Sequence, residues 1–478
     1  MSFSDRYRPN PAFARLGDDF SDPVEPADFP AAIDRFWNDR WAAAIGLDGL
    51  DTAAREAHFQ RFEPLPDNQV TPRAMRYHGH QFRTYNPDLG DGRGFLYAQM
   101  SDDRDRLLDL ATKGSGQTPW SRGGDGRLTL KGAVREVLAA EMLEALGVYT
   151  SKAFCVFETG EQVARNDEPS PTRSAVLTRL GHSHLRFGTF QRHAHEGASD
   201  RVGQLIDHAI EHYYPHLDGA PDRPAALLEA VVAASAGLAA GWMPAGFVHG
   251  VLNTDNLNLT GESFDYGPWR FLPHYEPGFT AAYFDQQGLY SFARQPEAVF
   301  WALQQLANAL ALVGERSSLE AALNTFPTLY REALLDAFLR CFGVASAGEE
   351  ADEALVRSFL AFMEASRMGW QAPFHDWFCG EASARRALAG PRAHAYAGEA
   401  FETWQAALLA HEPVRPERLA NPLFERTDPV DLVIDTVEAC WASIADSDDW
   451  SGFETLIGDI RLTGKGFDLG RDRVGFRP

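Results

Sequence analysis

The stretch from residue 249 to residue 272 reads HGVLNTDNLNLTGESFDYGPWRFL. Residues 256–259 alternate polar and apolar side chains, which is the period of a strand with one buried face. Turn-forming residues 261–263 follow, so the pattern predicts a hairpin that brings Asn256 and Asp265 together at one end of a small sheet.

The oxygen-bearing side chains of this stretch indicate a metal site for a nucleotide. Hard cations such as magnesium prefer oxygen ligands and retain several waters, so Asn256 and Asp265 would form a magnesium site together with substrate phosphates. Asp255 would lie on the opposite side of the pleat, where it is free to accept a proton. The alternative is a loop in which Asp and Asn side chains cap turns, as most of them do.

The composition describes a folded protein with an acidic surface. Of its 478 residues, 45% are hydrophobic and 23% are charged, which is enough apolar material for a substantial core. The length fits one large two-lobed domain or two to three smaller ones. The net charge of -23 argues against general binding to nucleic acid or to anionic membranes, so we expect neither as a partner.

The features that report on cellular location favour the cytoplasm. No apolar run reaches the roughly 18 residues that a membrane-spanning helix needs, and the N-terminal sequence MSFSDRYRPNPAF has no hydrophobic signal core. The cysteines lie far apart without CxxC spacing, which favours reduced thiols over a disulfide framework or a zinc site: Cys155, Cys341, Cys379 and Cys440.

A glycine-rich turn lies upstream and consists of Gly90, Asp91, Gly92 and Arg93. Residues 95–100 follow it as an apolar run that predicts a strand. Glycines at such a turn let backbone N–H groups approach a phosphate, and Arg93 adds a fixed positive charge. The same residues would equally suit an ordinary hairpin turn.

A lysine and a glutamate follow in the order that protein kinases use. Residues 107–112 predict a strand that ends at Lys113, and residues 131–146 predict a helix that carries Glu136 near its first turns. In kinases such a Lys contacts nucleotide phosphates, and the Glu holds the Lys in position. A surface Lys and an unrelated helical Glu are the alternative. The succession of glycine loop, Lys, Glu, Asn and Asp nevertheless matches the kinase order.

The rest of the chain predicts strands and then many helices. Strands are predicted at residues 152–157 and 174–180, and a helix at residues 30–47. Arg179 and Arg186 lie close in sequence, where an arginine pair suits either phosphate binding or a carboxylate partner. From residue 200 onward the periodicity predicts helices over these ranges: 202–214, 223–242, 296–312, 328–342, 350–365, 398–411 and 429–445.

Taken together, these motifs resemble the selenoprotein O family, a branch of the protein-kinase-like fold. The matching segments, in family order, are YHGHQF, LGDGRG, KGSGQTPWSRGGDGRLTLKGAVRE, AVLTRLGHSHLRFGTFQ, HGVLNTDN, FDYGPWRF and GLYSFARQPEAVFWAL. The resemblance implies an α+β, kinase-like pseudokinase fold with two lobes. Residues 1–185 would form an N-terminal extension and a small β-rich N-lobe with one key helix. Residues 186–478 would form a large helical C-lobe with the metal and catalytic loop.

The resemblance also implies an activity and its residues. The family is thought to transfer AMP from ATP to protein hydroxyls, so we expect a magnesium- or manganese-dependent protein adenylyltransferase acting on Ser, Thr or Tyr. Asp255 would be the proton acceptor, Asn256 and Asp265 would be metal ligands, and Asp265 would also help to bind nucleotide. The other implied nucleotide-binding residues are Gly90, Gly92, Arg93, Lys113, Asp125, Gly126, Arg179 and Arg186, with Glu136 holding Lys113.

The sequence departs from these patterns at several points. Kinases place the catalytic Asp five residues before the metal-binding Asn in HRDxxxxN, whereas Asp255 directly precedes Asn256, which favours attack at a different phosphorus. Arg83 stands where the family usually has Gly, and AAYF replaces an Asn-His-Ser run. The chain finishes RDRVGFRP, so we expect no redox control through a C-terminal cysteine pair. Two alternatives stay open, namely a kinase that moves the γ-phosphate and a nucleotide-sensing pseudokinase without transfer.

Overall fold

The computed structural model describes residues 3–166 and 168–469, and the expectation about C-terminal redox control lies outside them. Its largest sheet has eight antiparallel strands in the order β1-β3-β6-β7-β10-β9-β2, with β8 paired to β10. The strands are β1 (Ser21–Pro23), β2 (Ile33–Trp37), β3 (Arg73–Met75), β6 (Leu96–Ser101), β7 (Leu107–Lys113), β8 (Leu128–Thr129), β9 (Lys152–Val163) and β10 (Thr172–Gly181).

The middle of the sheet positions the predicted lysine. β7 is buried along its whole length and ends at Lys113, which lies opposite Leu177 of β10. α3 (Leu130–Ala145) packs against β9 and β10. It begins after Thr129, whose side-chain oxygen accepts a hydrogen bond from the backbone N–H of Gly132 at 3.1 Å and so caps the helix. The predicted strand before Lys113 and the predicted helix after it are both confirmed.

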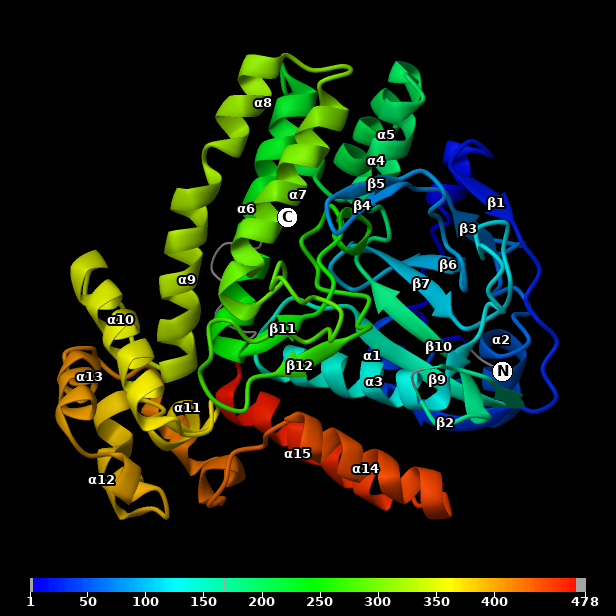
Figure 1. Ribbon diagram of the computed structural model, residues 1–478. Helices are drawn as coiled ribbons and strands as arrows, with labels where there is room; N and C mark the ends of the chain where they lie inside the picture. Colours follow the sequence, from blue (N-terminus) through cyan, green and yellow to red (C-terminus); the bar gives the residue numbers. More distant parts are fainter. Residues whose placement is uncertain (1–2, 167, 470–478) are drawn as a thin grey trace.

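The remaining chain is largely helical and lies to one side of the sheet (Figure 1). The long central helix α6 (Arg223–Ala245) packs against α7 (Gln295–Leu310), α8 (Arg316–Leu323) and α9 (Phe326–Phe342). The other helices are α1 (Asp39–Ala44), α2 (Thr52–Phe59), α4 (Phe187–His195), α5 (Ser199–His212), α10 (Glu349–Ser366), α11 (Ala372–Asp376), α12 (Ala384–Ala389), α13 (Glu399–Leu409), α14 (Ile434–Ser447) and α15 (Ser451–Phe467). This arrangement is compatible with the predicted α+β class.

Contrary to the prediction that no segment could span a bilayer, α6 is long and apolar enough to do so by length and composition. However, 61% of its most apolar window is buried inside the protein, as in the core helix of a folded domain. Asp222 caps its N-terminus by accepting a hydrogen bond from the backbone N–H of Ala225 at 3.2 Å. Gly246, with a φ of 66°, closes its C-terminus in the left-handed conformation.

The helix predicted over residues 30–47 is wrong. The first part of this range is the strand β2, and only the short helix α1 follows it. In β2, Phe36 and Trp37 pair with Val156 and Cys155 of β9. Pairing with a neighbouring strand therefore overrides the helical spacing of the apolar residues.

The hairpin predicted between Asn256 and Asp265 is also wrong. Asp255 and Asn256 lie in the 3-10 helix η3 (Thr254–Asn256). The strands that do pair are β11 (Phe247–His249) and β12 (Trp269–Phe271), which flank the stretch on either side. Residues 250–268 form the loop between them, here called the β11–β12 loop. Its alternating pattern arises because its leucines, Leu257 and Leu259, are buried in the main core.

The last two helices hold α3 at both ends. α15 and α14 pack against α3 (Figure 1). Near the C-terminal end of α3, the buried Glu141 accepts hydrogen bonds from Arg461 of α15 at 2.8 Å and from Arg40 of α1 at 3.1 Å. At its other end, Lys131 donates to Glu438 of α14 at 2.6 Å. Glu136, which lies between these anchors, is thus carried on a firmly fixed helix.

Candidate active site

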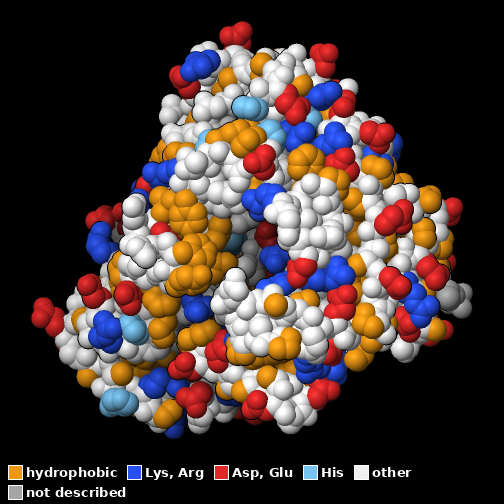
Figure 2. Space-filling model, turned by 45° about the vertical axis from the view of Figure 1, so that its right-hand side comes forward, with side chains coloured by type: hydrophobic (Ala, Val, Ile, Leu, Met, Phe, Trp, Pro, Cys, Tyr) orange, Lys and Arg blue, Asp and Glu red, His pale blue; other side chains and the backbone are white. Residues whose placement is uncertain are grey.

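A pocket of about 630 Å³ is lined both by the sheet and by the β11–β12 loop. The space-filling view shows a hollow near the middle of one face, with basic and acidic side chains in and around it (Figure 2). All but one of the residues predicted for the site line the pocket: Gly90, Gly92, Arg93, Lys113, Asp125, Gly126, Arg179, Arg186, Asp255, Asn256 and Asp265. The exception is Glu136, which reaches the pocket through its contact with Lys113.

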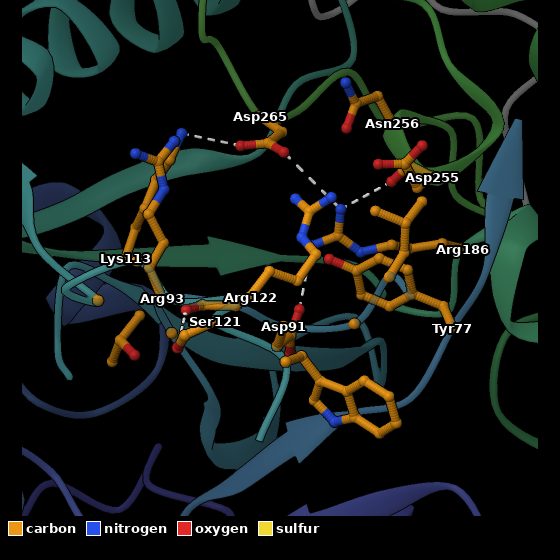
Figure 3. Close-up of a pocket in the computed structure, with 18 of the residues that line it drawn as sticks. Tyr77, Asp91, Arg93, Lys113, Ser121, Arg122, Arg186, Asp255, Asn256 and Asp265 are labelled. Carbon is orange, nitrogen blue, oxygen red and sulfur yellow. Dashed lines mark hydrogen bonds and ion pairs between the residues drawn. The ribbon is translucent and has the colours of Figure 1, made fainter. Parts of the chain in front are cut away.

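Lys113 and Asp265 meet in this pocket although 152 residues separate them in the sequence. The Nζ atom of Lys113 lies 2.8 Å from Oδ1 of Asp265 and also donates to Oε1 of the buried Glu136. Arg179 of β10 approaches the same Asp265 oxygen at 3.2 Å. Figure 3 shows Asp265 between Lys113 and Arg186. The structure therefore brings together the Lys, Glu and Asp that the sequence places far apart.

Cations surround the carboxylate of Asp265. Burial by itself opposes its ionisation, but Lys113, Arg179 and Arg186 outweigh that effect and hold its pKa well below the usual range. The backbone of Asp265 is left-handed, with a φ of 62°, which is uncommon outside glycine and concentrates at functional sites. Asp265 is therefore an anion at neutral pH, as a metal ligand must be.

Asp255 differs from Asp265 in that its carboxylate lacks a cationic partner at bonding distance. The residue is 8% exposed, and its Oδ1 atom has no hydrogen-bond partner among the described residues. Burial, partly offset by the charge of Arg186, raises the pKa of Asp255 to about 6. A carboxylate with such a pKa is suited to accept a proton from a substrate group near neutral pH.

Hydrogen bonds fix the loop around Asp255. The hydroxyl of Thr254 donates to Gln191 at 2.6 Å and accepts from the backbone N–H of His80 at 2.7 Å. The side-chain nitrogen of Asn256 donates to the carbonyl of Val251 at 3.0 Å. Because the nitrogen is used in this bond, the amide oxygen is the atom that Asn256 can offer a cation.

Arg186 connects the walls of the pocket. It donates to the backbone carbonyl of Asp255 at 2.7 Å and lies 3.3 Å from Oδ1 of Asp91. Its guanidinium lies 4.5 Å from the ring centre of Tyr77 and 5.0 Å from that of Phe264, within the range of cation–π attraction. Burial disfavours the charge, but the neighbouring anionic groups prevail and raise the pKa of Arg186. It is thus a permanent and fixed cation in the pocket.

The glycines of the site allow close approach of two loops. A Cβ atom at Gly90 would lie 2.3 Å from the ring of Trp120, and one at Gly126 would lie 2.3 Å from the backbone of Gly116. Gly126 also has a φ of 70°, which favours glycine. Next to it, Asp125 accepts a hydrogen bond from Arg165 at 2.7 Å. Asp125 is therefore engaged by an arginine at the edge of the pocket.

Sequence reasoning missed three polar residues that line the pocket. Asp91 orients Arg186 and accepts a hydrogen bond from the backbone N–H of Met75 at 3.0 Å. Arg122, with a φ of 49°, and Asn253 line the same pocket. The position of Asp91 within the glycine-rich turn was a usable signal. Nothing in the spacing of Arg122 or Asn253 distinguished them from other loop residues.

The donor atoms fit a hard metal ion. Asn256 and Asp265 both offer oxygen, which is what magnesium and manganese prefer. Across residues 3–166 and 168–469, no group of three or more His, Cys, Asp or Glu side chains is placed to hold a metal. A cation held by two protein oxygens completes its coordination with phosphate oxygens and water.

Similar proteins identify the class. A relative from Gloeobacter violaceus is 43% identical over 463 residues, covering 94% of each chain, and one from Synechococcus elongatus is 41% identical over 95% of each chain. A relative from Pseudomonas putida strain GB-1 is 40% identical over 89% of this chain and 87% of its own. Each of them is named protein nucleotidyltransferase YdiU, so the fold and site are those of the protein nucleotidyltransferases.

The family is narrower than this class. The family model described as protein adenylyltransferase SelO matches residues 5–461, which is nearly the whole chain. The protein therefore belongs to the SelO family. The resemblance inferred from the sequence motifs is confirmed.

Proposed function

We propose that this protein transfers AMP from ATP to the hydroxyl groups of Ser, Thr or Tyr residues in other proteins, with Mg²⁺ or Mn²⁺ as the metal. The observation that carries the proposal is the meeting of Lys113, Glu136 and Asp265 in one pocket with Asp255 and Asn256 beside them. Fixed positive charge in a partly enclosed site is what a triphosphate requires. SelO family membership supports the same activity.

Each charged group has a role in this proposal. Lys113, held by Glu136, binds phosphate oxygens, and Arg179 and Arg186 neutralise further phosphate charge. The turn residues Gly90, Gly92 and Arg93 and the pair Asp125 and Gly126 contact the nucleotide from the opposite loops. Asn256 and Asp265 hold the metal ion, which supplies Lewis-acid stabilisation of phosphate charge when bound.

Asp255 acts as the proton acceptor in the transfer. It removes the proton from the acceptor hydroxyl, whose oxygen attacks the α-phosphorus of ATP. A phosphodiester bond forms between that oxygen and the α-phosphorus, while the bond from the α-phosphorus to the bridging oxygen breaks. Pyrophosphate leaves with the bonding electron pair. Attack at the α-phosphorus rather than the γ-phosphorus is favoured because Asp255 directly precedes the metal-binding Asn256, unlike the spacing in HRDxxxxN.

A kinase-like division into two lobes is part of the proposal. Its support is the antiparallel sheet with Lys113 on a central strand, the single helix α3 carrying Glu136, and the helical remainder. The boundary at residues 185 and 186 falls between β10, which ends at Gly181, and α4, which begins at Phe187. The location proposed is the cytoplasm, which suits four cysteines that are all free and buried. Neither nucleic acid nor membrane is proposed as a partner, in keeping with the net charge of -23.

The position of an isotope label tests the activity. Purified protein is incubated with a cell lysate, Mg²⁺ and ATP labelled at either the α- or the γ-phosphorus. We expect the α-label to appear on protein, with an AMP adduct on a hydroxyl residue detected by mass spectrometry. Transfer of the γ-label alone would indicate a kinase instead. ATP binding without transfer of either label would indicate a nucleotide sensor.

The rate of transfer is expected to depend on pH through Asp255. Burial raises the pKa of this carboxyl to about 6, and only its ionised form accepts a proton. The value of kcat/KM should therefore rise about tenfold per pH unit below 6 and level off above it. Asp265, whose pKa is held low by cations, stays ionised over the same range, so ATP binding should change little. A profile that is flat between pH 5 and pH 7 would contradict the role of Asp255.

A further inference from the structure

Three exposed aromatic side chains form a cluster beside the pocket, here called the aromatic cluster. Phe82, Tyr283 and Phe284 are 36%, 85% and 46% exposed. The ring centre of Phe284 lies 5.8 Å from that of Phe82 and 5.1 Å from that of Tyr283. Figure 2 shows hydrophobic side chains gathered beside the hollow. Isolated exposed apolar residues are ordinary, but several large ones in contact mark an interaction surface.

Direct contacts link the aromatic cluster to the loop that carries Asp255. Phe82 follows Gln81, which lines the pocket, and its backbone N–H donates to Oδ1 of Asn253 at 3.0 Å. The same oxygen accepts from the hydroxyl of Tyr290 at 2.8 Å, and the rings of Phe82 and Tyr290 lie 5.0 Å apart. Asn253 also lines the pocket and stands two residues before Asp255. The cluster is therefore continuous with the position of the proton acceptor.

The backbone at Phe82 is strained in a way that keeps this side chain at a hairpin tip. The strands β4 (Gly79–Gln81) and β5 (Thr84–Asn86) are joined by only Phe82 and Arg83, with φ values of 48° and 64°. Two-residue turns with positive φ at both positions strongly favour Asn and Gly. Bulky residues in such conformations persist where the surroundings enforce them, and they concentrate at functional sites.

We propose that the aromatic cluster docks the acceptor protein by taking up an apolar side chain next to the residue that is modified. This inference rests on the proposed function and specifies its substrate class. Oδ1 of Asp255 is buried without a partner among the described residues and lines the pocket, so it needs a hydroxyl donor. ATP occupies the phosphate-binding residues, and the acceptor hydroxyl must come from a second molecule. A polypeptide segment supplies both that hydroxyl and an apolar neighbour.

Synthetic peptides test this docking role. Each peptide carries one central Ser, Thr or Tyr, flanked either by Leu and Phe or by Ser residues that cannot be modified because they are replaced by Ala in a matched set. With ATP labelled at the α-phosphorus, we expect the unmodified enzyme to prefer the Leu and Phe set. The double variant Tyr283→Ser and Phe284→Ser should raise KM for that set about tenfold, because a few aromatic anchors carry most of the energy of an interface. Its kcat and its Kd for ATP should not change.

A matched control and three other outcomes decide the matter. Val70→Ser alters a single side chain that is 76% exposed, and it should leave every parameter unchanged. An unchanged KM in the double variant would overturn the docking role while leaving the proposed function intact. A change from dimer to monomer in solution, with KM unchanged, would instead assign the cluster to contact with a second copy. If the unmodified enzyme labels no peptide and no lysate protein, the proposed function fails, and this inference fails with it.

Discussion

Replacing Asp255 by Asn is expected to slow AMP transfer by about 10²–10⁴-fold, the range contributed by a well-placed general base. The amide has nearly the same shape as the carboxylate, but it cannot accept the proton of the acceptor hydroxyl. ATP binding should persist, because the cations that face the phosphates are Lys113, Arg179 and Arg186. The measurement is the initial rate of α-label transfer at saturating ATP, together with the Kd for ATP from calorimetry.

Stability provides an internal check on this variant. A carboxyl whose pKa rises on folding weakens the folded state once the pH exceeds that pKa, and burial raises the pKa of Asp255 to about 6. At pH 7 the Asp255→Asn protein should therefore unfold at the same temperature as the parent or at a higher one. Asp88→Asn, which changes an exposed carboxylate after the β4–β5 hairpin, serves as the control and should retain full activity. Retention of more than about a tenth of the rate by Asp255→Asn would exclude a general-base role.

Replacing Asp265 by Ala is expected to remove the metal dependence of ATP binding. The loss of affinity in the presence of Mg²⁺ should be about 100-fold or more, because even residues behind metal ligands change metal affinity 10–100-fold. The variant also leaves Lys113, Arg179 and Arg186 without the anion that they share. Their charge would then attract metal-free ATP at least as strongly as before.

Titrations with Mg²⁺ and with EDTA separate these two effects. In the parent protein Mg²⁺ should strengthen ATP binding, whereas in Asp265→Ala the two titrations should agree. Asp265→Asn keeps the size of the side chain but removes its charge, and it should behave like Asp265→Ala. If either variant binds Mg²⁺-ATP as tightly as the parent, Asp265 is not a metal ligand.

The order of chemical groups along the chain was enough to predict which residues share the pocket. Lys113 at the end of a strand and Glu136 on the next helix followed from local periodicity, because β7 and α3 are regular elements with caps and buried faces. The approach of Asp265 to Lys113 did not follow from periodicity. It came from the family resemblance, since contacts across 152 residues leave no local pattern.

Errors arose where tertiary contacts override local spacing. The alternation at residues 256–259 reflects two leucines buried by the core rather than a strand, so the predicted hairpin does not form. The aromatic spacing at residues 30–47 belongs to β2 and α1, because β9 provides a pairing partner that the sequence does not reveal. Asp91 and Arg122 were missed as site residues since their positions depend on how two loops fold against each other.

The anchoring of α3 has a consequence for control of the enzyme. Many kinases are switched off by swinging the equivalent helix outward, which separates its Glu from the Lys. Here that rotation would have to break the contacts of Glu141 with Arg461 and of Lys131 with Glu438 at opposite ends of the helix. The Lys113–Glu136 pair is therefore assembled permanently, and regulation must act on the supply of nucleotide or on the encounter with the acceptor.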